Sequence, residues 1–82
     1  MTPDDEDFYK SLGKRIAELR TARDMTQQQL ADELGLSQKT VGHYEVGRIR
    51  PQISMLPALA HSLGVTIQTL FGPLAKPSGK RK

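Results

Sequence analysis

Residues 27–46, QQQLADELGLSQKTVGHYEV, decide the fold because they encode two short helices around the connection Gly35-Leu36-Ser37. Thr26 and Gln29 form a capping box that starts the first helix. Glycine in the connection ends that helix, since glycine adopts the left-handed conformation at little cost, and the serine caps the second helix. The stretch therefore predicts two helices joined by a very short turn.

Helices joined so tightly must cross at a steep angle, which requires a small residue where the two backbones approach. Ala31 supplies it and faces Val41 of the second helix. The DNA-binding helix-turn-helix has a characteristic spacing: a small residue, a glycine four positions later and an apolar residue six positions after the glycine. Ala31, Gly35 and Val41 match this spacing. The remaining inner positions are apolar or aromatic: Leu30, Leu34, Leu36 and Tyr44.

Three further helices flank this pair, and nothing in the chain is typical of a strand. The first is capped by Thr2, buries an apolar stripe at helical spacing and stops near residue 23. That stripe comprises Phe8, Leu12, Ile16 and Leu19. Gly13 is a weak point of this helix on propensity grounds. The sequence therefore predicts an all-α fold of five helices.

The fourth helix begins near Ile53 or Ser54, because Pro57 is tolerated only in a first turn. It ends at Gly64. Thr66 caps a short fifth helix that contains Ile67, Leu70 and Phe71, of which we assign Leu70 to the core.

Composition confines the chain to one small domain without a metal site. It has 82 residues, of which 37% are hydrophobic and 26% charged, and no cysteine. No apolar run approaches the roughly 18 residues of a membrane span, and the acidic start is unlike a signal peptide, so we expect a cytoplasmic protein. The net charge of +3 divides into −3 over an acidic extension of helix one (1–10), +2 over the domain (11–72) and +4 over a basic tail (73–82).

The domain resembles the lambda-repressor and Cro-like helix-turn-helix (XRE-type) regulators over residues 11–72. The resemblance is carried by Leu12-Gly13-Lys14-Arg15-Ile16, Leu19-Arg20, Met25-Thr26-Gln27, Gln29-Leu30-Ala31, Leu34-Gly35-Leu36-Ser37, Val41, Tyr44-Glu45, Gly47-Arg48, Pro51, Leu56, Leu63-Gly64-Val65 and Leu70. Two residues depart from the family pattern: Pro57 early in helix four, and Gly42 at a position that usually carries a side chain.

The resemblance implies a compact five-helix lambda-repressor-like domain whose third helix enters the major groove of double-stranded DNA while the second crosses the phosphate backbone. The base-reading positions then hold Ser37, Gln38, Lys39, Gly42 and His43. Glutamine pairs with adenine and lysine with guanine, so Gln38 is the leading base reader. For His43 a base edge, a phosphate and solvent all remain open.

Phosphate contacts are expected from Gln27, Lys39, Arg48 and Arg50. The resemblance also implies an ion pair between Arg20 and Glu45 that ties helix one to the end of helix three. Gly42 either lets helix three approach the groove closely or has no role. The basic tail we expect to be solvated.

These features predict a sequence-specific transcriptional repressor that binds a palindromic operator as a homodimer. Ile67, Phe71 and Leu74, with Ile49, are the apolar candidates for the dimer interface. The alternative is a protein-interaction module on the same scaffold, such as an antitoxin that binds a toxin, or an antirepressor. No catalytic arrangement or phosphate-binding loop is present, so we expect neither enzymatic activity nor a cofactor.

Overall fold

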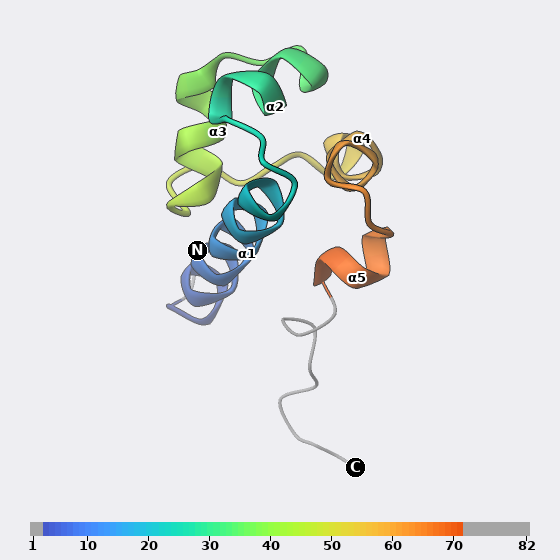
Figure 1. Cartoon of the computed structure of the whole chain (residues 1–82). Coiled ribbons are helices and arrows are strands. Elements are labelled where there is room, and N and C mark those ends of the chain that lie inside the picture. Colours follow the sequence, from blue (N-terminus) through green and yellow to red (C-terminus); the bar gives the residue numbers. More distant parts are fainter. Residues whose placement is uncertain (1–2, 72–82) are drawn as a thin grey trace.

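A computed structural model describes residues 3–71 of the chain (Figure 1). Within these residues it contains helices and no strand. They are α1 (Pro3–Ala22), α2 (Gln27–Leu34), α3 (Gln38–Glu45), the 3-10 turn η1 (Ile53–Met55), α4 (Leu56–Leu63) and α5 (Ile67–Phe71). Thr2, Leu74 and the tail 73–82 lie outside the described part of the chain. The predicted all-α fold with five helices is confirmed.

The helix ends around the short connection follow the local sequence. At the start of α2, the Thr26 hydroxyl accepts from the Gln29 backbone N–H and the Gln29 side chain accepts from the Thr26 N–H. Gly35 ends α2 with φ of 70°, and the Ser37 side chain accepts from the Thr40 N–H at the start of α3. The capping box and both caps are therefore as predicted.

The start of α4 differs from the prediction in its helix type. Helical backbone begins at Ile53, but as a 3-10 turn, and the α-helix follows only at Leu56. An α-helix from Ile53 would need a hydrogen bond from the Pro57 nitrogen to the Ile53 carbonyl, and proline has no N–H to donate. Instead the Leu56 N–H donates to the Ile53 carbonyl oxygen, three residues earlier, as in a 3-10 helix. Pro57 thus lies in the first turn of α4, as expected.

One apolar core joins all five α-helices. In Figure 1, α2 and α3 lie above α1, while α4 and α5 lie to its right. Ala31 and Val41 are completely buried where α2 and α3 cross, and Leu70 is completely buried in the core, as predicted. The other buried apolar or aromatic residues are Leu12, Ile16, Leu30, Tyr44, Leu59, Ala60 and Leu63. None of the described helices is long and apolar enough to span a membrane.

Gly13 has a different role from the one its helix propensity suggests. It lies where α1 crosses the end of α3, and an added Cβ would come within 2.6 Å of the Glu45 carbonyl oxygen and closer still to that of Tyr44. Backbone atoms at that position cannot give way as a flexible side chain would. Gly13 is therefore the close-contact point that allows α1 and α3 to pack, a role that its low helix propensity did not indicate.

Candidate nucleic-acid interface

Glu45, at the end of α3, is held by Arg20 of α1. Arg20 Nε lies 2.6 Å from Glu45 Oε2 and its Nη2 lies 3.2 Å from Oε1, so the guanidinium holds the carboxylate with two hydrogen bonds. The same guanidinium donates to the Met25 carbonyl at 2.7 Å. The two side chains are only 14% and 6% exposed, which strengthens their attraction relative to a solvated pair. The arginine thus connects α1, the α1–α2 connection and α3.

Gln27 extends this network from α2 to the start of α3. Its Nε2 donates to Glu45 Oε1 at 2.9 Å, and its Oε1 accepts from Gln38 Nε2 at 3.4 Å. Gln27 was expected to contact phosphate. That expectation concerned the free N–H groups at the start of the helix. The structure engages the side chain with both ends of α3, and the backbone N–H of Gln27, in the first turn of α2, remains available to an anion.

The outer face of α3 carries the expected base-reading residues. Ser37, Gln38 and Lys39 are exposed at the beginning of the helix, and His43 is partly exposed one turn later. No acidic side chain lies in the first turn of α3, and the only carboxylate of the helix is neutralised by Arg20. This face is therefore polar and without uncompensated negative charge.

Gly42 lies on α3 and faces the start of α2. A Cβ at this position would lie 3.7 Å from Gln27 Nε2, which is an ordinary van der Waals distance. The fold therefore does not require glycine here, in contrast to Gly13.

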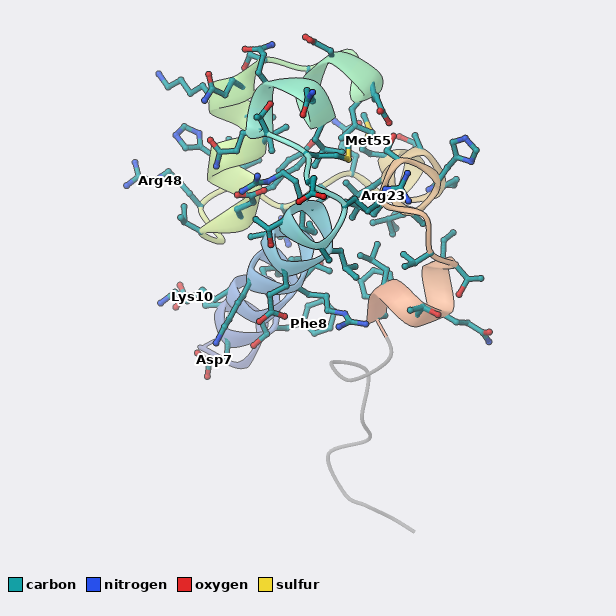
Figure 2. All side chains as sticks on the ribbon, viewed as in Figure 1. Asp7, Phe8, Lys10, Arg23, Arg48 and Met55 are labelled. Atoms are coloured by element: carbon teal, nitrogen blue, oxygen red, sulfur yellow. The ribbon has the colours of Figure 1, made fainter. Side chains whose placement is uncertain are left out.

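The loop after α3 places its two arginines in different surroundings. Arg48 is exposed and projects from the side of the molecule on which α3 lies (Figure 2). Arg50 is also exposed, but its guanidinium carbon lies 5.6 Å from the centre of the Tyr9 ring of α1 in a cation–π contact. Of the expected phosphate-binding arginines, only Arg50 is thus oriented by a partner within the described part of the fold.

The inner face of α3 is anchored by Tyr44. Its side chain is 6% exposed, and burial raises the pKa of the phenol above its ordinary value. The ring therefore stays uncharged at physiological pH and packs with Val41 in the core. Anchored in this way, α3 presents only its opposite face to a ligand.

The expected dimer residues divide between core and surface. Ile67 is 40% exposed and Ile49 41% exposed, whereas the Phe71 ring stacks on Phe8 of α1 at 5.9 Å between ring centres. Leu74 lies outside the described residues. Within α5, Ile67 is thus the apolar residue whose side chain is most exposed and free to contact a second copy.

Comparison with known proteins identifies the fold family. A family model described as helix-turn-helix matches residues 16–70, which is most of the chain. The chain belongs to this helix-turn-helix family.

Its relatives within the family are regulators by name. The chain is 36% identical to the SPbeta prophage-derived HTH-type transcriptional regulator YonR of Bacillus subtilis over 72% of this chain and 55% of that one. It is 36% identical to the immunity repressor protein of Bacillus phage phi105, over 76% of this chain and 43% of that one. With the HTH-type regulator y4dJ of Sinorhizobium fredii it shares 34% identity over 92% and 99% of the two chains. The chain spans about half the length of the first two.

A solved structure of the same helix-turn-helix fold supports the assignment. The restriction-modification controller protein C.AhdI from Aeromonas hydrophila matches with a TM-score of 0.76 and 32% identity, over 80% of this chain and 96% of that one. The arrangement of α1 to α5 described above is therefore the arrangement of known helix-turn-helix proteins.

Sequence reasoning missed two features that hold the helix-turn-helix in place. The first is the bridging role of Gln27, for which the side-chain types alone gave no signal. The second is Gly13, for which a signal existed: Gly13 lies seven residues before Arg20, two turns along the same face of α1. Because Arg20 was expected to contact α3, Gly13 on the same face of α1 could have been expected to lie against α3 as well.

Proposed function

We propose that this protein is a sequence-specific double-stranded DNA-binding transcriptional regulator, a repressor that acts as a homodimer on a palindromic operator. The observation that carries the proposal is the chain of contacts Arg20–Glu45–Gln27–Gln38. It orients an exposed glutamine at the start of the helix that in this fold enters the major groove.

Gln38 is the leading base reader in this proposal. Its carboxamide has the geometry to pair with N6 and N7 of adenine. Its long hydrogen bond to Gln27 favours one orientation of the side chain before DNA arrives, which lowers the entropy lost on binding. Lys39 then donates to guanine or to a phosphate, and Ser37 and His43 border the same face.

Gly42 permits close approach of α3 to the groove floor. Glycine costs about 1 kcal/mol in a helix interior, and the space around this position accommodates a Cβ. Neither packing nor helix propensity therefore explains a glycine at position 42. This supports a requirement for glycine that comes from the bound DNA.

Backbone contacts in this proposal come from the first turn of α2 at Gln27 and from Lys39, Arg48 and Arg50. Two copies of the domain would bind successive half-sites about 34 Å apart, which multiplies the affinity of a single small interface. Ile67, Phe71 and Leu74 are the residues we propose for the contact between copies.

Selection of bound sites from random duplex DNA tests the proposal. The expected result is an enriched consensus with two inverted half-sites whose centres are separated by about one helical turn. Enrichment of a single half-site would disprove the dimeric mode only. Absence of any enriched sequence would overturn the proposed function and favour a protein-interaction module such as an antitoxin or antirepressor.

A further inference from the structure

The loop after α3 is pressed against the N-terminal half of α1. Gly47 has φ of 76°, and a Cβ on it would lie 2.9 Å from the Cα of Lys10 and 2.8 Å from its Cγ. Both the left-handed conformation and the lack of space therefore require glycine at this position. The consequence is that Lys10, a residue outside the helix-turn-helix, lies directly beside the loop that carries Arg48.

Lys10 and Arg48 present their charges on one side of the molecule. Figure 2 shows both side chains projecting toward the same side, which is also the side of α3. Both residues are exposed, and among residues 6–71, whose side chains the structure describes, neither has an ion pair with an acid. They form a basic row that runs from the loop after α3 to α1. Helix α3 itself carries a further exposed lysine, Lys39.

The row ends sharply on α1. Asp7 lies one turn before Lys10 and projects away from Arg48 in Figure 2. A carboxylate repels phosphate, so a polyanion that follows the basic row cannot favourably extend beyond Lys10 along this helix.

We propose that Lys10 binds a DNA backbone phosphate and forms the outer end of the DNA contact surface, beyond the helix-turn-helix itself. This inference rests on the proposed function. Lysine suits the task because its ammonium group is a point charge on a flexible stem that reaches a phosphate without strict geometry. The contact adds affinity on every sequence and no base preference.

The test compares Lys10→Gln with wild type by measuring DNA affinity at several salt concentrations. Each lost phosphate contact makes the slope of log K against log salt shallower by about 0.9, and the base preference stays the same. Lys10→Arg should keep the wild-type slope. Arg23→Gln is the charge-matched control, because Arg23 lies just beyond the C-terminal end of α1, against Gly64 at the end of α4 (Figure 2).

The outcomes separate this inference from the proposed function. If wild type binds an operator and Lys10→Gln has the wild-type slope, Lys10 does not bind phosphate and the inference is overturned. It is also overturned if Arg23→Gln makes the slope equally shallow, because the effect would then reflect net charge alone. If wild type binds no duplex DNA, the proposed function itself fails.

Discussion

Gln38 donates its side-chain N–H to the side-chain oxygen of Gln27 across the short turn between α2 and α3. Gln27 in turn donates to Glu45, whose carboxylate is held by Arg20. The residue proposed to read DNA is therefore connected through side chains to the long helix α1, although it lies on the exposed face of α3.

Replacement of Gln38 by alanine is predicted to remove discrimination at one base pair. A bidentate glutamine–adenine contact contributes about 1–3 kcal/mol of discrimination, so competition binding against operators altered at single positions should show that loss at one position only. Gln28→Ala is the matched control, since Gln28 bonds to Asp32 on the exposed surface of α2. Uniform weakening on all operators would argue against a base-reading role.

Glu45→Gln is predicted to destabilise the fold. The change leaves the largely buried Arg20 guanidinium without its counter-charge, while the Met25 carbonyl still accepts one of its hydrogen bonds. We expect a loss of roughly 2 kcal/mol in the free energy of unfolding, below the 3–5 kcal/mol typical of fully buried pairs. Urea denaturation measures it, and Glu33→Gln on the exposed face of α2 should change little. Equal losses in the two variants would contradict the structural role of the pair.

Gly13→Ala and Gly42→Ala are predicted to have opposite effects on stability. At position 13 the added methyl group meets backbone of α3 and costs about 1–3 kcal/mol by overpacking. At position 42 it meets only the Gln27 side chain, at an ordinary van der Waals distance, and gains up to about 1 kcal/mol of helix propensity. Thermal unfolding gives the stabilities. If Gly42→Ala is more stable yet keeps full DNA affinity, close approach at Gly42 is excluded.

The sequence predicted the features that depend on neighbouring residues. It predicted fewer of the contacts between helices that are distant in the sequence. The capping box of Thr26, the left-handed turn at Gly35 and the first-turn position of Pro57 depend on neighbouring residues only. The close approach at Gly13 depends on where α3 lies after packing.

For the candidate interface, the resemblance indicated which residues share a surface and one of the contacts that position them. The Arg20–Glu45 pair expected from it is present in the structure. The engagement of Gln27 with both ends of α3 and the contact of Arg50 with Tyr9 arise only in three dimensions, because each joins segments distant in the sequence. Neither the residue pattern nor the resemblance specified these two contacts.

Arg50→Ala is predicted to weaken DNA binding equally on all operators and to make its salt slope shallower by about one unit. The variant also loses the cation–π contact with Tyr9. The attraction in such a contact is about 0.5–1 kcal/mol at an exposed site. Tyr9→Leu removes that contact and keeps the charge, so it separates the two effects: its salt slope should remain that of wild type. An unchanged slope in Arg50→Ala would remove Arg50 from the proposed phosphate contacts.

Charges introduced on α5 are predicted to dissociate the proposed dimer. Phe71→Glu should sediment as a monomer, but it also disrupts the stack with Phe8 that holds α5 to α1. Ile67→Glu leaves that stack intact and places the charge on partly exposed apolar surface, so it tests the interface without unfolding the helix. Gln68→Glu adds the same charge to an exposed position of α5 and should remain dimeric. Sedimentation equilibrium of the three variants measures their oligomeric states, and a dimer formed by Ile67→Glu would move the interface to the surface around Ile49.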